Sequence, residues 1–553
     1  MRAGIERFFW TVAYLKPVQI WGRFASALKR RFKRVPGLAE IASDAFVQRN
    51  AHQKPVCGRV RFCFLSEARD YPIDAVEWDV IPSAGFGGEV PVKLWRYNLH
   101  YFDWLNQGEL ANDKEAAAYL ILDWTARCAD DSAEPWEPYP TSRRLESWLK
   151  WLRGKPPAVS DPAFMALMRR SISAQVRRLE IDREVHIQGN HLLKNFMALV
   201  LSTAWLLETR DGDAPGLRKK FAKHAASLAR EIGEQILPDG GHYECSPMYH
   251  RELLEGVSEV ADTVRRFAAG QACGETSSAC ADLLGVCEGV LPAMRTWLDL
   301  LTHPDGRIAL FHDSALNAEI YKNSYKDNKR FEAWLAESGY FISRHSGGDY
   351  LVLCAHGPSP VHQPGHSHAD IGSFELSLHG RRVIVDTGTG SYQNPEIRQL
   401  CRSTQAHNVP LVEGSEQSDM WGNFRVGRRA CMIRTAHDDG WFELAWRDMN
   451  GNEYERRITF GQAAFVVRDR LVTRRSQGTF VSMIHLAPGM HWSSRESVGS
   501  LAFEGRPFCR FMTKAVAQQE TSMYYPEFGA GQENVRLRLV AGDEDAIEYS
   551  VYR

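Results

Sequence analysis

The chain has 553 residues, enough for two or three domains, and its 67 Lys and Arg against 68 Asp and Glu leave a formal net charge of -1. A charge this close to zero provides no global field to attract nucleic acid or an anionic membrane, so an anionic ligand would have to be held locally. The content of 44% hydrophobic and 24% charged residues is that of an ordinary globular protein and excludes disorder, collagen and coiled coil.

The first 90 residues show the weakest pattern, a basic stretch near 29–34 followed by a few strand-like segments, and we treat them as an N-terminal extension. Thr11, Lys16 and Pro17 interrupt the apolar N-terminus and no small-residue cleavage site follows, so we expect no signal peptide. The 11 cysteines contain no C-x-x-C pair, and no run of about 18 apolar residues could span a bilayer. The cytoplasm is therefore the default location, with the periplasm and secretion left open.

Residues 91–337 are assigned to a helical domain. Apolar residues recur there at spacings of three and four, and Pro and Gly punctuate the gaps. The pattern predicts antiparallel helices joined by short loops, over residues 113–129, 142–153, 163–180, 189–208, 216–236, 247–268, 278–301 and 328–337.

Residues 338–553 are assigned to a second domain because the apolar period changes to two. His379-Gly380 and Asp438-Asp439-Gly440 stand where tight hairpins would need them. Strands that follow strands predict an antiparallel β-sandwich beside the helical domain, so the fold class is multidomain α+β. The clearest strands are 349–355, 373–378, 382–386, 441–446, 456–460, 464–469, 479–486 and 535–540.

The densest polar cluster runs from Gly365 to Phe374 and leads directly into a predicted strand. His368 in this cluster, Asp386 at the end of the next strand and His407 beyond it form a nitrogen and oxygen ligand set suited to zinc. Taken singly, each is better explained as a hydrogen-bonded structural residue. Both interpretations stay open on the residues alone.

Two segments of the helical domain carry candidate functional groups. Asn190 and His191 open an apolar helix, whose N-terminus suits a carboxylate ligand. Plain N-capping by Asn190 is the alternative. The second segment, residues 239–252, crowds polar and aromatic side chains into a loop that enters a helix, where Pro247 fits the first turn.

Aromatic residues gather at 94–104 and 136–148 beside arginine and asparagine. Flat rings with polar neighbours are typical of a sugar-binding cleft. Arg143 or Arg144 could pair with a carboxylate or a sulfate through both of its terminal nitrogens. Ordinary helix packing with solvated arginines explains the same pattern equally well.

At these positions the chain resembles the heparinase II/III family of polysaccharide lyases. The matching stretches are the Asn190-His191 helix start, Tyr-Glu-Cys-Ser-Pro-Met-Tyr-His at 243–250, and the run from Gly365 to Arg429. The resemblance covers most of the chain after about residue 90. It implies a helical (α/α) toroid followed by an antiparallel β-sandwich, and cleavage of uronic-acid glycans by β-elimination.

The resemblance also implies roles for individual residues. Asn190, with His191, would neutralise the uronate carboxylate as the C5 proton leaves. Tyr249 and His366 would carry the protons to and from C5 and O4, with Tyr243 as a rival to Tyr249. The residues expected to contact the sugar are Arg143, Arg144, Tyr243 and Glu244.

By the same resemblance, His368, Asp386 and His407 hold a divalent metal, zinc rather than calcium, in a structural role. The expected partner is an acidic polysaccharide bound between the domains, with no nucleic acid and no membrane span. A homodimer is left open.

Three other functions fit the sequence. A uronate C5-epimerase on the same scaffold would return the proton without cutting the chain. A glycoside hydrolase would need two carboxylates that flank the bond, for which Asp239 and Glu244 are the candidates. A non-catalytic glycan-binding protein of polysaccharide assembly would need neither proton-transfer residues nor a pair of flanking carboxylates.

Overall fold

The computed structural model describes residues 2–51, 58–79, 92–209, 214–270, 274–316, 330–461, 463–495, 498–542 and 544–553. The chain divides into two compact units. The helical unit comprises residues 16–235 and 253–292, and the strand unit comprises 1–15, 236–252 and 293–553. The units therefore do not follow the single boundary at residue 337 that the change of apolar period suggests.

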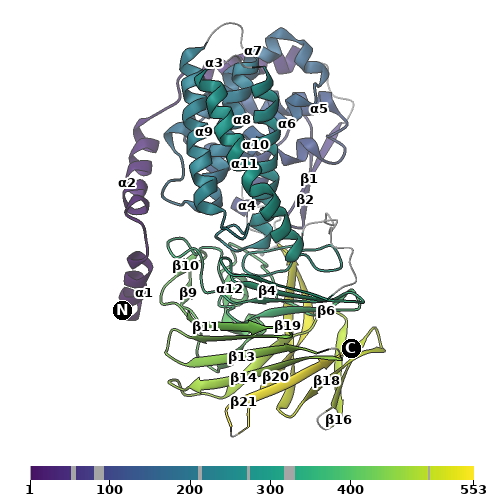
Figure 1. Cartoon of the computed structure of the whole chain (residues 1–553). Helices are drawn as coiled ribbons and strands as arrows, with labels where there is room; N and C mark the ends of the chain where they lie inside the picture. Colours follow the sequence, from purple (N-terminus) through teal and green to yellow (C-terminus); the bar gives the residue numbers. More distant parts are fainter. Residues whose placement is uncertain are drawn as a thin grey trace. The chain divides into compact units, whose positions relative to one another are not determined.

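The helical unit contains antiparallel helices joined mostly by short loops (Figure 1). The helices predicted between residues 113 and 301 are confirmed, each within a few residues. Their bounds are α4 Val92–Tyr101, α5 Lys114–Arg127, α6 Pro138–Arg153, α7 Pro162–Ile181, α8 Gly189–Glu208, α9 Pro215–Gln235, α10 Pro247–Ala269 and α11 Glu275–Leu300, of which α10 and α11 each extend into the strand unit.

The helix starts follow local chemistry. The Asp113 side chain accepts a hydrogen bond from the Ala116 amide at the start of α5, and Asp161 caps α7 just before Pro162. The tryptophans of the two aromatic segments are buried, and Trp148 packs edge-on against the buried Trp124 of α5 at 5.5 Å. These rings therefore form the core of the helical unit.

The N-terminal extension has more structure than its sequence pattern indicates. It forms α1 (Arg2–Ala13), α2 (Pro17–Phe32), α3 (Leu38–Ala51) and a hairpin of β1 (Arg59–Phe64) with β2 (Glu67–Pro72). The helix predicted over 328–337 is wrong: residues 328 and 329 lie outside the described residues, and Phe331–Leu335 is strand β3. The run is too short for its apolar spacing to distinguish the two periods.

The strand unit is built from antiparallel sheets, and every strand predicted from the sequence is present. A five-stranded sheet has the order β3-β4-β5-β6-β7, an eight-stranded sheet the order β11-β12-β13-β14-β21-β18-β17-β16, and a four-stranded sheet the order β19-β20-β15-β8. The bounds are β4 Tyr340–His345, β5 Asp349–Cys354, β6 Phe374–Leu378, β7 Arg381–Ile384, β8 Pro410–Val412, β9 Met420–Trp421, β10 Arg425–Val426, β11 Cys431–Asp438, β12 Trp441–Arg447, β13 Glu453–Phe460, β14 Ala464–Thr473, β15 Phe480–His485, β16 Met490–Arg495, β17 Val498–Phe503, β18 Arg506–Thr513, β19 Val516–Glu527, β20 Ala530–Val540 and β21 Ala546–Tyr552.

Both predicted hairpins are confirmed. His379 and Gly380 have φ of 51° and 78° between β6 and β7, as a two-residue turn of this kind requires, and Gly440 has φ of 87° before β12. β5 and β6 are buried along their whole length. The loops that carry the candidate site, 309–316, 365–373 and 385–394, therefore belong to a unit with a rigid, buried sheet.

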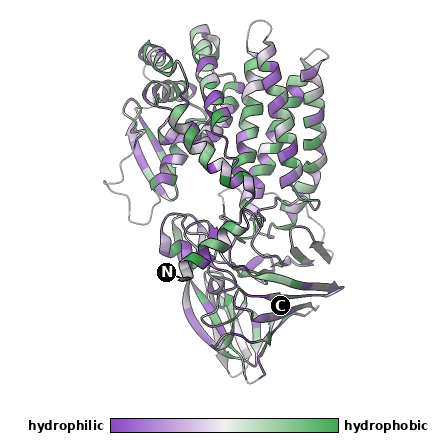
Figure 2. Ribbon diagram, turned by 90° about the vertical axis from the view of Figure 1, so that its left-hand side faces the viewer, coloured by the Kyte–Doolittle hydropathy of each residue, from purple (hydrophilic) through white to green (hydrophobic). Residues whose placement is uncertain are grey.

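The described helices carry hydrophobic and hydrophilic residues side by side (Figure 2). None of them combines the length and the apolar character needed to cross a bilayer.

Candidate active site

Asp313 lies at the centre of a buried polar cluster in the strand unit. Its Oδ2 is 2.8 Å from His366 Nδ1, its Oδ1 is 2.9 Å from His368 Nε2, and the Arg398 guanidinium donates to both oxygens. Burial alone would raise the pKa of Asp313, but the charge of Arg398 and the bonds from the two histidines hold that pKa well below its usual range. Asp313 is therefore an anion that orients three groups: the imidazoles of His366 and His368 and the guanidinium of Arg398.

The contact with Asp313 sets the tautomer of His366. A carboxylate only accepts, so Nδ1 of His366 carries the hydrogen and Nε2 is left with its lone pair. Nε2 lies 3.8 Å from Glu244 Oε2, and the ring lies against the Tyr249 ring with 4.1 Å between centroids. His366 is therefore held so that Nε2 can accept a proton next to a phenol.

Tyr249 stands in the first turn of α10 and meets a second tyrosine. Ser246 accepts from the Tyr249 amide at 3.3 Å and fixes this turn. The Tyr249 and Tyr392 hydroxyls are 2.9 Å apart, and the Arg398 guanidinium lies 4.9 Å from the centre of the Tyr392 ring. Burial raises the pKa of both phenols well above 10, so at neutral pH they form a neutral hydrogen-bonded pair that can pass a proton.

The other residues of segment 239–252 lie differently. The Tyr243 ring packs beside His242 and His362 at 4.9 and 5.7 Å, whereas the Tyr249 ring lies against His366 at 4.1 Å. Asp239 accepts from the amide and the hydroxyl of Ser338 at 2.7 and 2.8 Å. That carboxylate is engaged in holding a turn, which disfavours the pair of carboxylates that a hydrolase would need.

Asn190 and His191 belong to the helical unit. Asn190 is buried in the first turn of α8, but the cap position is Gln188, so Asn190 is not the N-cap. His191 Nδ1 is 3.0 Å from Glu184 Oε1 and its ring lies 4.4 Å from that of Tyr139. Burial would raise the pKa of Glu184, but the charge and hydrogen bond of His191 outweigh it and the pKa is lowered.

The two candidate arginines differ sharply in exposure. Arg144 is fully buried, donates to Gln175 Oε1 and to the Pro135 carbonyl, and stacks on Trp124 at 4.0 Å. It is a core residue of the helical unit. Arg143 has a partly exposed side chain and pairs with Asp103 Oδ2 at 2.6 Å, which leaves it able to meet a solvent-borne anion.

The predicted metal ligands lie near one another in the strand unit. His407 Nδ1 is 2.8 Å from Asp386 Oδ2, and the His368 and His407 rings are 5.3 Å apart. His368 Nδ1 and His407 Nε2 are buried with no hydrogen-bond partner among the described residues. Two orphaned imidazole nitrogens beside a carboxylate fit a metal chemically. Within the part of the chain that the structure describes, the three potential ligands whose donor atoms all lie within 4.8 Å of one another are different residues: His312, Cys354 and His356.

Sequence reasoning missed three residues of the cluster: Asp313, Tyr392 and Arg398. Asp313 sits in a short loop without a motif, and Tyr392 follows the glycine-rich turn Gly388-Thr389-Gly390. Arg398 lies on the eight-residue helix α12 (Pro395–Arg402), whose start Asn394 caps. The Asn-Pro pair was the one local signal for that helix.

Comparison with known proteins places the whole arrangement in context. A family model described as "Heparinase II/III N-terminus" matches residues 70–332, and one described as "Heparinase II/III-like, C-terminal" matches residues 328–552. Together the two matches span residues 70–552, which include Asp313 and every residue of its cluster.

Individual relatives are more distant. The chain is 24% identical over 347 residues to a heparin-sulfate lyase of Bacteroides stercoris, covering 57% of this chain and 49% of that protein. It is 21% identical over 383 residues to a heparin-sulfate lyase of Pedobacter heparinus, covering 59% and 54%. The chain thus spans about half the length of the curated relatives it matches.

A solved structure supports the architecture. A crystal structure of heparinase III matches with a TM-score of 0.63 at 14% identity, over 86% of this chain and 79% of that one. At this identity the likeness concerns the fold, and it agrees with a helical toroid followed by antiparallel sheets.

Proposed function

The chain belongs to the heparinase II/III family, and we propose that it is a polysaccharide lyase that cleaves a uronic-acid glycan by β-elimination. The observation that carries the proposal is the contact of Tyr249 with His366, with Asp313 fixing the histidine and Tyr392 bonded to the tyrosine. The names of the relatives suggest heparan-type glycans as the first substrates to try.

The chemistry needs a base and an acid on one sugar. A base takes the C5 proton, the C5–H electrons form the C4–C5 double bond, and O4 leaves with a proton from the acid. We assign the base to His366, whose Nε2 holds a lone pair, and the acid to Tyr249, which keeps its proton at neutral pH because burial raises its pKa. Tyr392 would then return a proton to Tyr249 and regain one from solvent, while His366 releases the C5 proton to solvent.

The remaining predicted roles rest on sequence and local chemistry. Asn190, with His191, is proposed to neutralise the uronate carboxylate as the carbanion forms. Arg143 is proposed to contact the glycan, together with Tyr243 and with Glu244, which lies 3.8 Å from His366 Nε2. Arg144 is dropped because Gln175, the Pro135 carbonyl and Trp124 enclose its guanidinium in the core of the helical unit. Zinc is proposed at His368, Asp386 and His407, where it would add a structural cross-link.

The test is incubation of the purified protein with sulfated and unsulfated uronate polysaccharides, following the ultraviolet absorbance of the unsaturated product. Tyr249→Phe should lower turnover by about 10²–10⁴-fold while glycan binding persists. Tyr350→Phe is the matched control, because its buried hydroxyl also donates one hydrogen bond, to the Leu300 carbonyl at 2.7 Å. It should cost about 1 kcal/mol of stability and no turnover.

No unsaturated product across the panel from folded protein would overturn the lyase assignment. Saturated chain ends would indicate a hydrolase. Exchange of the C5 proton with solvent without chain scission would indicate an epimerase.

A further inference from the structure

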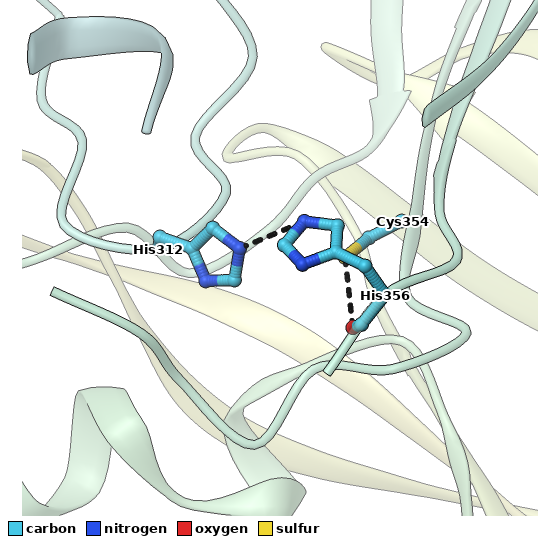
Figure 3. Close-up of side chains that lie close together, drawn as sticks. All are labelled: His312, Cys354 and His356. Carbon is cyan, nitrogen blue, oxygen red and sulfur yellow. Dashed lines mark hydrogen bonds between the residues drawn. The ribbon is translucent and has the colours of Figure 1, made fainter. Parts of the chain in front are cut away.

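We propose that His312, Cys354 and His356 form a metal site that is separate from the predicted His368, Asp386 and His407 set. The ligand atoms of the trio lie within 4.8 Å of one another, inside the strand unit. Cys354 ends β5, and His356 follows two residues later, so both reach the same side of the extended chain (Figure 3). His312 comes from the loop that carries Asp313.

The spacing of the donors fits tetrahedral zinc. The Nε2 atoms of His312 and His356 are 3.2 Å apart. Two nitrogen ligands about 2.0–2.1 Å from a tetrahedral ion lie roughly 3.3–3.4 Å from each other. A thiolate at about 2.3 Å would be roughly 3.6 Å from each nitrogen, within the observed limit.

The outer nitrogen of each imidazole lies near an oxygen acceptor, which is where a metal-binding histidine places it. His356 Nδ1 lies 2.8 Å from the Gly357 carbonyl, and because a carbonyl only accepts, His356 must carry its hydrogen on Nδ1. His312 Nδ1 lies 3.1 Å from Asp370 Oδ2. Donation from the outer nitrogen to a carbonyl or carboxylate is the usual support of a metal-binding histidine.

This arrangement turns two lone pairs toward each other. With Nδ1 of each ring as the donor, both Nε2 atoms are acceptors at 3.2 Å, and only a cation or a proton between them relieves the repulsion. The alternative puts the His312 hydrogen on Nε2, with Nδ1 accepting from the His368 amide at 3.3 Å. In that case a simple N–H···N bond joins the rings.

The charges around the site balance for a divalent ion. Metal binding would release the proton of the Cys354 thiol to solvent and leave a thiolate. The Asp370 carboxylate, 3.1 Å from His312 Nδ1, supplies a second negative charge beside the site. One Zn²⁺, one thiolate and one carboxylate sum to zero in a site without exposed surface at His312 or Cys354.

His312 is held in a conformation that side chains seldom adopt. Its φ is 57°, in the left-handed region, and such residues persist where the surroundings enforce them. A bound ion would pin this loop to β5. The next residue is Asp313, so the ion would hold in place the carboxylate that orients His366.

Cobalt substitution of the full chain distinguishes this site from the set of His368, Asp386 and His407, which contains no thiol. The protein is stripped with a chelator, loaded with Co²⁺, and scanned for thiolate-to-cobalt charge transfer in the near ultraviolet. We expect the band in the wild type and in His407→Gln, and its loss in Cys354→Ser. Cys509→Ser, which removes another buried thiol of the strand unit, should keep the band.

Zinc stoichiometry gives the second readout. His356→Gln should bind one equivalent of zinc less than the wild type, with circular dichroism confirming that it is folded. A wild type without the charge-transfer band overturns the proposal, and this result does not depend on any variant folding. A band that persists in Cys354→Ser would arise from another thiol, such as the exposed Cys63 or Cys431, and would also overturn it.

A second, independent feature is the helix α2, which turns its apolar face outward. Toward the helical unit it presents Gln19, Gly22 and Ser26: Gln19 is 2% exposed, and Ser26 donates to Asp182 at 2.5 Å. The outward side chains are between 38% and 73% exposed, and they are Val18, Ile20, Trp21, Phe24, Leu28 and Phe32.

This polarity is the reverse of that of an ordinary surface helix. α2 contains no Asp or Glu, and Arg23, Lys29 and the following Lys33 are exposed beside the apolar face. An apolar face flanked by basic residues is typical of helices that lie in the interface of a membrane. We propose that α2 docks on an anionic phospholipid surface.

Flotation with vesicles tests this proposal. The protein should bind vesicles of phosphatidylcholine with phosphatidylglycerol, less so at high salt, and should not bind phosphatidylcholine alone. Trp21→Ser with Phe24→Ser should abolish binding, whereas Phe46→Ser, at a phenylalanine of α3 that is 51% exposed, should not. No binding to either vesicle overturns the proposal. Self-association that the double variant abolishes would show that a second copy covers the face, which overturns it equally.

Discussion

Replacing Asp313 by Asn would remove one buried negative charge and leave its shape. The carboxylate meets the Arg398 guanidinium and two imidazoles, and Asp313 and Arg398 are 0% and 1% exposed at their side chains. Breaking a buried ion pair from one side costs about 3–5 kcal/mol, because the other charge stays buried without a counterion. That is about a fifth or more of the stability of a typical domain.

Urea unfolding followed by tryptophan fluorescence and circular dichroism measures this loss. Asp545→Asn is the control, because Asp545 pairs with Arg474 at the surface, where each side chain is more than a third exposed. An exposed pair contributes about 0–1 kcal/mol. Asp313→Asn should also lower turnover, because the Asn amide can donate to His366 and favour the wrong tautomer.

A free energy of unfolding for Asp313→Asn within about 1 kcal/mol of that for Asp545→Asn would refute the reasoning. It would mean that Arg398 finds another partner or that water reaches the cluster. A normal turnover in the destabilised variant would separately refute the role of Asp313 in orienting His366.

Three further substitutions should lower the free energy of unfolding by different amounts. Glu184→Gln should lower the free energy of unfolding by about 1–3 kcal/mol at pH 7. Because His191 lowers the pKa of Glu184 in the folded state, this difference from wild type should fade as the pH drops below about 4, which unfolding measured across pH will show. Ser246→Ala should cost about 1 kcal/mol in the same assay, since it removes the cap of α10. Gly388 has φ of 74°, and a Cβ added there collides with a main-chain carbonyl; Gly414 has φ of 80° but open space around it. Gly388→Ala should therefore lower the free energy of unfolding by ~1–3 kcal/mol more than Gly414→Ala does. Equal losses would contradict the steric argument.

The long helices and the regular strands were predictable because their apolar residues repeat over many turns. α8 and α10 differ from their predicted ranges by at most one residue, and β5 and β15 by one or two. β3 was not predictable, since Phe331–Leu335 is five residues long and fits either period. The helices α1 to α3 were not predicted either. In α2 the apolar side chains are exposed, whereas a helix prediction expects the apolar face to be buried.

The site was predictable only where residues form a local motif. His366 and Tyr249 each lie in a distinctive run, whereas their orienting partners come from loops that are distant in the sequence. Asp313 is 53 residues from His366, and Tyr392 is 143 residues from Tyr249. Pairings of that kind follow from the folded chain and leave no trace in spacing. Arg144 shows the converse: its polar neighbours suggested a ligand contact, but its stacking on Trp124 buries it.

The strand unit borrows residues 236–252 and 293–330 from the half of the chain that reads as helical. A protein engineer who expressed the strands alone, starting after residue 337, would discard Tyr249, His312 and Asp313 together while keeping His366. The isolated fragment would have an unsupported histidine and an open sheet edge. Attempts to transplant the C-terminal half onto another carrier should therefore bring both borrowed segments along.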